Sequence, residues 1–141
     1  MKLLNVPNSF IGYKTINEKI CSDLIDFFND DTYFIAREGK TTTKVNKDIK
    51  DSWDKTIPIY CEHPTISDYI SSLQQCINGY AELFPNLNSI NFRLANEFNI
   101  QKYPKGGGYK TWHCERMSDM SKTNGRVLAF MTYLNDVEEG G

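Results

Sequence analysis

The sequence predicts an α+β fold, in which helices and short strands precede a run of longer strands. Two segments in the first 84 residues repeat apolar side chains at intervals near 3.6, as amphipathic helices do. Three later segments, between residues 88 and 137, have the alternating or β-branched pattern of strands. This order of elements favours helices packed on an antiparallel sheet or half-barrel.

The composition is that of one globular domain spanning residues 1–141. Hydrophobic residues make up 40% and aromatic residues 13% of the chain, which favours a packed core over disorder. The net charge of −2 argues against nucleic acid as a partner, because such surfaces usually carry a basic excess. The sequence shows neither a secretory signal nor a membrane-spanning run, so a cytoplasmic location without membrane association is expected. The four cysteines show no CxxC spacing and are expected to be reduced thiols.

The first helix is predicted in "TINEKICSDLIDFFND", residues 15–30. Its apolar stripe consists of Ile16, Ile20, Leu24, Phe27 and Phe28. A short strand, "TYFIARE", follows at residues 32–38, because aromatic and β-branched residues dominate it. The segment from Lys40 to Lys55 is the most basic part of the chain. It is either a solvated loop or a flap that faces a substrate.

A second helix is predicted after the short strand "IPIYCEHP", residues 57–64, which Pro64 ends. Thr65 is the expected N-cap of this helix, Asp68 suits the positive charge of its first turn, and Pro85 ends it. The apolar stripe of the helix consists of Ile66, Tyr69, Ile70, Leu73, Ile77, Tyr80 and Phe84.

The segment "NSINFRLANEFNIQKY", residues 88–103, is predicted to be a strand with two unlike faces. Phe98 and Ile100 point one way, whereas Asn99, Gln101 and Tyr103 point the other way. The first face is expected to cover a core, and the second to line water or a ligand cavity. Two more strands are predicted in "GYKTWHCER", residues 108–116, and "GRVLAFMTYLNDV", residues 125–137.

The strand predicted at residues 108–116 carries the residues suited to chemistry. Side chains two apart on a strand share a face, so His113 and Glu115 can reach toward one point, and together they suit a divalent first-row metal ion. Trp112 faces the opposite way, toward a core, and Arg116 is expected at the surface or in support of the site. The preceding glycines, Gly106 to Gly108, permit positive φ and a tight connection between strands, which is also what a simple hairpin needs.

Two stretches together resemble a known family. "NIQKYPKGGGYKTWHCE" followed by "GRVLAFMTYLNDVEEGG" is similar to the 2-oxoglutarate- and Fe(II)-dependent oxygenases of the prolyl 4-hydroxylase type, which include phage and bacterial relatives. The resemblance is close from Asn99 to Gly141 and holds only in outline before that. It implies N-terminal helices, at about residues 14–90, packed on an incomplete double-stranded β-helix of the jelly-roll or cupin type, whose first strands lie at about residues 91–141.

The resemblance also assigns roles to individual residues. His113 and Glu115 are the implied iron ligands, with glutamate standing where the family usually has aspartate. Tyr103 resembles the pocket tyrosine near the iron and the co-substrate. Tyr133 matches the tyrosine that bonds the distal carboxylate of 2-oxoglutarate, and it shares a strand face with the small Ala129, while Leu128 and Phe130 would face a core.

The implied activity is the hydroxylation of a C–H bond, most simply in a prolyl residue of a peptide or protein substrate. The implied cofactors are Fe(II) and 2-oxoglutarate, with ascorbate as a further candidate. O₂ would be consumed, and CO₂ and succinate would be released. The basic segment from Lys40 to Lys55 is the expected region of substrate contact.

Two further residues that the family needs, a distal histidine and a basic anchor for 2-oxoglutarate, are not found after the "GG". The only other histidine, His63, is expected to be a turn residue. The chain is therefore expected to be the N-terminal portion of such an enzyme, with further residues, a second chain or self-association completing the barrel. The alternatives are an inactive binding domain that retains the fold, and a zinc domain built from Cys61, His63, His113 and Cys114.

Overall fold

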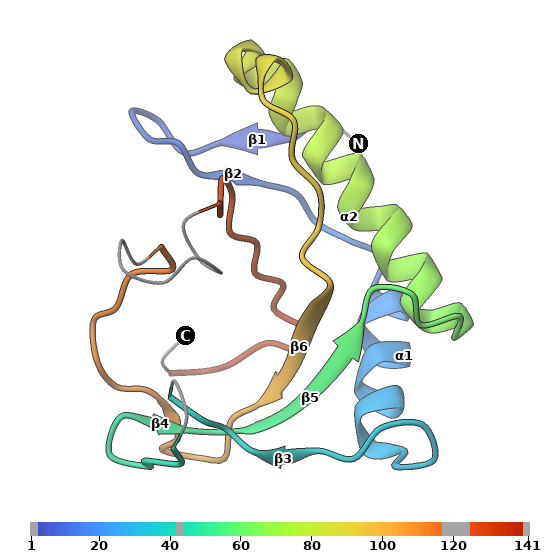
Figure 1. Cartoon of the computed structure of the whole chain (residues 1–141), viewed down its shortest axis with the longest axis vertical. Coiled ribbons are helices and arrows are strands. Elements are labelled where there is room, and N and C mark those ends of the chain that lie inside the picture. The colour runs from blue at the N-terminus through green and yellow to red at the C-terminus, as the bar shows by residue number, and fades with distance from the viewer. Residues whose placement is uncertain (1–2, 42–43, 117–124, 140–141) are drawn as a thin grey trace. The chain divides into compact units, whose positions relative to one another are not determined.

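The computed structural model of the chain describes residues 3–41, 44–116 and 125–139. Contacts divide the chain into two compact units that interleave along the sequence. The first unit contains Met1–Asn29, Tyr60–Leu94 and Tyr133–Gly141, and the second contains Asp30–Ile59 and Ala95–Thr132. Both helices lie in the first unit, and most of the strands lie in the second (Figure 1).

The first unit is built on two helices that pack against each other, α1 (Glu18–Asn29) and α2 (Pro64–Leu83). The apolar stripes predicted from the sequence are confirmed, because the buried side chains of the helices belong to them. These side chains are Leu24, Phe27, Phe28, Ile66, Tyr69 and Leu73. A short 3-10 helix, η1 (Pro85–Ser89), follows α2 and buries Leu87.

The start of α2 differs from the prediction. His63, with extended backbone angles, is the N-cap residue, and Pro64 opens the helix. Thr65 therefore lies inside the first turn and is not the cap. Proline suits the first helical position because its φ is already fixed near the helical value and its missing N–H would have had no partner there. The backbone carbonyl of His63 accepts from the N–H groups of Ile66 and Ser67.

A hairpin that the sequence did not predict completes the first unit. It pairs β1 (Leu4–Asn5) with β2 (Gly12–Tyr13) in antiparallel fashion. The Tyr80 hydroxyl of α2 donates to the carbonyl of Phe10 at 2.7 Å, which ties the hairpin to the helix.

The second unit contains a three-stranded antiparallel sheet in the order β3 (Arg37–Glu38), β5 (Trp53–Pro58) and β6 (Glu97–Lys102). Strand β5 begins four residues before the strand predicted at 57–64, within a segment expected to be a loop. The predicted strand faces of β6 are confirmed. Ile100 is buried and pairs with Lys55, whereas Asn99 and Gln101 are exposed and pair with Thr56 and Asp54.

A second, two-stranded sheet in this unit joins β4 (Lys50–Asp51) to β7 (Gly108–Tyr109). The α+β class is thus confirmed, with two helices and small antiparallel sheets. No closed barrel is formed by the residues that the structure describes, and a jelly-roll core is not confirmed. Among these residues, no helix has both the length and the apolar character needed to cross a bilayer.

Candidate functional site

The glycine turn sets the path of the chain toward His113. Gly106 has φ +74°, a conformation that side-chain-bearing residues rarely adopt, and the N–H of Gly107 donates to the carbonyl of Pro104 at 2.7 Å. A Cβ on Gly107 would stand 2.7 Å from the backbone oxygen of Asp51, so only glycine fits this approach. The turn thereby brings β7 into pairing with β4, and Gly106 and Gly107 meet different requirements within it.

The pairing of β7 ends shortly before the predicted metal ligands. The last backbone hydrogen bond between these segments runs from Lys110 N–H to the carbonyl of Ile49 at 2.7 Å. Residues 110–116 have no strand structure, so the prediction of a strand through His113 and Glu115 is wrong. Trp112 is fully exposed, and its predicted core position is also wrong.

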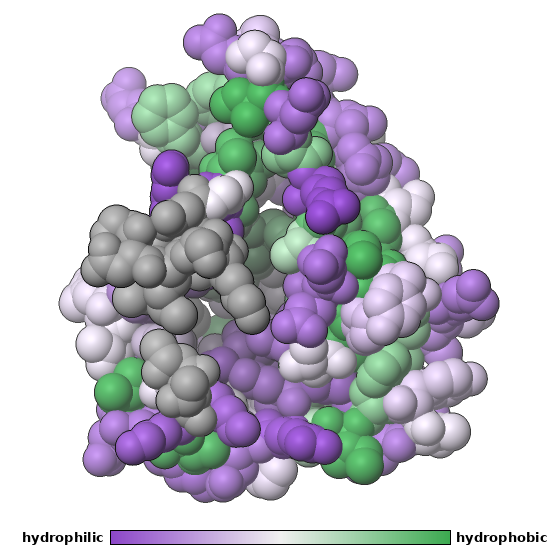
Figure 2. Space-filling view, in the orientation of Figure 1, coloured by the Kyte–Doolittle hydropathy of each residue, from purple (hydrophilic) through white to green (hydrophobic). Residues whose placement is uncertain are grey.

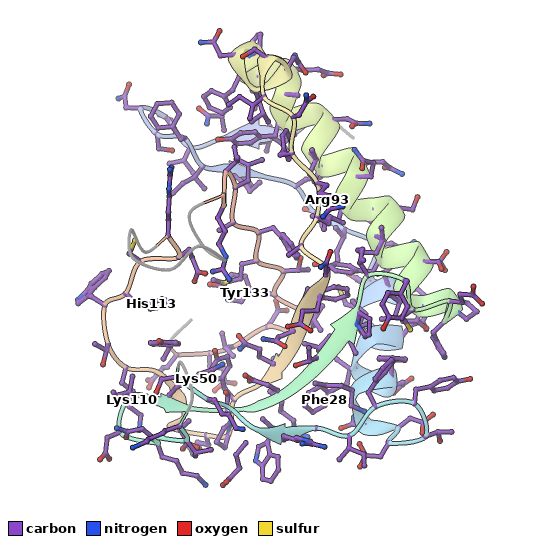
Figure 3. The ribbon with its side chains drawn as sticks, in the orientation of Figure 1. Phe28, Lys50, Arg93, Lys110, His113 and Tyr133 are labelled. Carbon is purple, nitrogen blue, oxygen red and sulfur yellow. The ribbon has the colours of Figure 1, made fainter. Side chains whose placement is uncertain are left out.

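His113 and Glu115 nevertheless converge. His113 Nε2 lies 3.2 Å from Glu115 Oε1, and the two side chains are 43% and 54% exposed. The ring of His113 stacks on that of Tyr109, with centroids 3.9 Å apart and an interplanar angle of 21°. Its other nitrogen, Nδ1, lies 3.2 Å from the carbonyl oxygen of Thr111. The ring is thus held on one face and at both nitrogens. Figure 3 labels His113 in its place on the chain.

Both ring nitrogens of His113 therefore face oxygen acceptors. A neutral imidazole has a single N–H, so one of the two contacts would set a nitrogen lone pair against an oxygen. A cation between the nitrogen lone pair and the oxygen removes this repulsion. The cation can be a second proton on the ring or a metal ion. A histidine that binds a metal through one nitrogen usually donates its other N–H to a backbone carbonyl, as Nδ1 can donate to Thr111.

The separation of the two candidate ligands also fits a shared ion. Two atoms bound at about 2.0–2.2 Å to one first-row divalent ion, at a right angle to each other, are about 3 Å apart. The observed 3.2 Å between His113 Nε2 and Glu115 Oε1 is close to that value. The pair supplies two ligands. Within the described part of the chain, no group of three or more His, Cys, Asp or Glu side chains is placed to hold a metal ion.

Arg126 contacts one of the candidate ligands, which the sequence did not reveal. Its Nη1 donates to Glu115 Oε2 at 2.7 Å and to the backbone carbonyl of Glu115 at 2.9 Å. The guanidinium therefore fixes one carboxylate oxygen and leaves the other toward His113. The two residues are eleven positions apart, and neither carries a local sequence signal for the other.

Tyr103 lies in the same unit, at the end of a polar network on β5 and β6. Its hydroxyl donates to Gln101 Oε1 at 3.1 Å, and Gln101 Nε2 donates to Asp54 Oδ1 at 3.2 Å. Burial, followed by the negative charge of Asp54, raises the pKa of Tyr103 above its usual value. The phenol is thus a neutral hydrogen-bonding group throughout the physiological range.

The buried centre of this network is an ion pair. Lys50 Nζ lies 2.5 Å from Asp54 Oδ2, with side chains only 6% and 13% exposed, and Ser52 donates to Asp54 Oδ1 at 2.8 Å. Lys50 belongs to β4, the strand that pairs with β7. The ion pair therefore connects the three-stranded sheet to the sheet that leads to His113.

The segment from Arg126 to Thr132, predicted to be a strand, has no regular structure, and residues 133–139 continue without it. Leu128 and Phe130 are exposed, so their predicted core positions are wrong. Tyr133 is 64% exposed and belongs to the first unit, whereas His113, Glu115 and Tyr103 belong to the second.

The described surface contains hollows in both units. One, of about 320 Å³, is lined by residues 114–116 and 126–129 and therefore includes Glu115 and Arg126. The other, of about 500 Å³, lies in the first unit between residues 14–23 and α2 and holds none of the predicted site residues. Comparisons of the chain with known protein families, with curated proteins and with solved structures gave no significant match.

Proposed function

We propose that the chain carries part of the active site of an Fe(II)- and 2-oxoglutarate-dependent dioxygenase that hydroxylates a C–H bond, in a prolyl residue of a peptide or protein. In this proposal the second unit forms part of a double-stranded β-helix core. The observation that carries it is the position of His113, whose two ring nitrogens both face oxygen acceptors at 3.2 Å. A divalent cation shared with Glu115 satisfies this arrangement.

The residues of this chain would act as follows. His113 and Glu115 hold the ion, Tyr109 keeps the imidazole ring in place by stacking, and Arg126 holds the second carboxylate oxygen away from the first. When bound, Fe(II) with 2-oxoglutarate supplies the activation of O₂. Tyr103 is the proposed contact for 2-oxoglutarate in the second unit. A neutral phenol at Tyr103, with its raised pKa, can donate a hydrogen bond to a carboxylate.

The facial triad needs a third ligand, and 2-oxoglutarate needs a cation for its distal carboxylate. The proposal assigns neither to a residue of this chain, since His63, the other histidine, is packed on Phe27 in the first unit. The assay therefore uses this chain and any longer natural protein that contains it.

The test is succinate release from 2-oxoglutarate in the presence of Fe(II), O₂ and a proline-containing peptide. Turnover should be lost in His113→Ala and retained in His63→Gln, the matched control for the other histidine of the chain. Turnover that survives His113→Ala would refute the proposal. Metal binding through His113 without turnover in any form of the protein would favour the alternative, a binding domain that retains the site without catalysis.

A further inference from the structure

The charges of the chain are unevenly divided between the two units. The ranges 30–59 and 95–132, which form the second unit, contain twelve Lys and Arg and nine Asp and Glu, a net charge of +3. The remaining residues contain four Lys and Arg and nine Asp and Glu, a net charge of −5. Within the second unit, segments 40–51 and 102–110 alone contain seven lysines and two aspartates.

The structure joins these two segments at one edge. Strand β4 pairs with β7, Lys110 N–H donates to the carbonyl of Ile49, and Lys110 Nζ donates to the carbonyl of Lys47 at 3.1 Å. The lysines exposed around this junction are called the basic edge here: Lys44, Lys47, Lys105 and Lys110. In Figure 3, Lys110 is drawn close to Lys50 of β4. The lower part of Figure 2 shows hydrophilic residues with hydrophobic patches between them.

Most of the charge on the basic edge is not neutralised locally. Lys47 forms an ion pair with Glu38 at 2.9 Å, and this hydrogen bond and charge raise the pKa of Lys47. In the described part of the chain, Lys44, Lys105 and Lys110 have no carboxylate within ion-pair distance. Like charges gathered without counter-charges do not help the fold, but they attract and orient an anionic partner.

The basic edge lies next to the proposed metal ligands. Tyr109, which pairs with Lys50, also stacks on the ring of His113. Lys110 and His113 are three residues apart, which is at most about 10 Å of extended chain. A bound peptide would therefore need only three or four of its own residues to reach from the basic edge to His113.

We propose that the basic edge binds an acidic segment of the peptide substrate, a few residues from the residue that is modified. This inference rests on the proposed function only in calling the bound peptide a substrate. A peptide fits better than a nucleic acid because Glu38, Asp48 and Asp51 stand among the lysines. A polyanion with a charge on every unit would meet these carboxylates, whereas a peptide can space its acidic residues to avoid them.

The experiment compares three labelled probes by fluorescence anisotropy, without metal or 2-oxoglutarate. The probes are a twelve-residue peptide with a central proline and four glutamates on one side, the same peptide with glutamines, and a single-stranded oligothymidine of twelve nucleotides. The glutamate peptide should bind about tenfold more tightly than the other two at low salt, and its advantage should shrink as salt is added.

Two charge-reversal variants locate the site. The double substitution Lys105→Glu and Lys110→Glu should weaken binding of the glutamate peptide about tenfold, whereas Arg93→Glu, a single charge reversal at an exposed residue of the first unit, should leave it unchanged. Circular dichroism checks that each variant is folded. If the double variant is not folded, Lys105→Gln and Lys110→Gln replace it, with the same ordering expected.

Equal binding of the two peptides would overturn the proposal, and so would an equal effect of Arg93→Glu. Tighter binding of the oligothymidine, with the same dependence on Lys105 and Lys110, would show that the edge serves a nucleic acid and would also refute it. Because the probes are bound without metal, these failures are distinct from failure of the dioxygenase proposal, which depends on His113.

Discussion

Replacing Asp54 by alanine should lower the free energy of unfolding by about 3–5 kcal/mol, because it leaves the buried ammonium group of Lys50 without its counter-charge. Lys50 is 6% exposed, so water cannot replace the lost carboxylate. The substitution also removes the acceptor used by Ser52 and Gln101. The double substitution Lys50→Met with Asp54→Ala also removes the buried positive charge. It should recover at least half of the lost free energy of unfolding.

The chain provides a matched control in a second Lys–Asp pair with the same sequence spacing. Lys19 and Asp23 lie on the surface of α1, with side chains 77% and 31% exposed. Asp23→Ala should cost only a small fraction of what Asp54→Ala costs, because exposed ion pairs are screened by water and salt.

The measurement is urea unfolding followed by tryptophan fluorescence, since Trp53 directly precedes Asp54 in β5 and reports on the second unit. Because the Lys50–Asp54 pair connects β4 to the sheet, Asp54→Ala should also weaken metal binding at His113, whereas Asp23→Ala should not. A loss below about 1 kcal/mol for Asp54→Ala, or a loss equal to that of Asp23→Ala, would refute the reasoning.

Three further predictions concern the site and its support. Arg126→Gln should weaken metal binding by about 10–100-fold in a metal-ion titration, because Glu115 loses the group that orients it. Arg126→Lys should recover part of the lost affinity. Because the pKa of Tyr103 is raised in the folded chain, stability should fall as the pH rises above the ordinary value of 10.0, where the unfolded chain loses the phenol proton before the folded chain does. The free energy of unfolding of Tyr103→Phe should therefore decrease less with pH over this range than that of the unaltered chain. Gly107→Ala should cost about 1–3 kcal/mol, since its Cβ would stand 2.6 Å from Pro104 Cδ, whereas Gly125→Ala meets nothing within 4 Å and should be neutral in thermal unfolding.

The helices could be predicted from sequence because their signal is local. Every position in the apolar stripes, such as Leu24 and Ile66, is decided by the spacing of neighbouring residues. The faces of β6 were predictable for the same reason, since Ile100 and Gln101 simply alternate.

The first residues of β5 were not predicted to be a strand because their polar side chains are typical of a loop. Lys55 is nevertheless fully buried, since its ammonium group donates to the carbonyl of Asp30 at 2.7 Å and to Asp31 at 3.2 Å. Asp54, likewise, is tolerated inside β5 because it forms an ion pair with Lys50. A polar residue inside a strand can be recognised only when its distant partner is known, and hydrophobic periodicity does not contain that information.

Of the contacts around the candidate ligands, only their proximity to each other could be predicted. The spacing of His113 and Glu115 indicated that they converge, and the structure brings them to 3.2 Å, although on an irregular segment and not on a strand. The contact of Arg126 with Glu115 depends on the return of the chain after eleven residues. The stacking of Tyr109 on His113 depends on the turn through three glycines that precedes them. Neither could be read from the sequence, because both depend on tertiary structure.

The most direct test of the account is an anaerobic titration of the chain with Fe(II), or with Co(II) as a spectroscopic substitute. One ion should bind per chain, and either His113→Ala or Glu115→Ala should weaken binding more than tenfold, because each removes a ligand. His63→Gln should bind the ion as the unaltered chain does. Binding that persists in both ligand variants, or that is lost only in His63→Gln, would contradict the assignment of the metal site to His113 and Glu115.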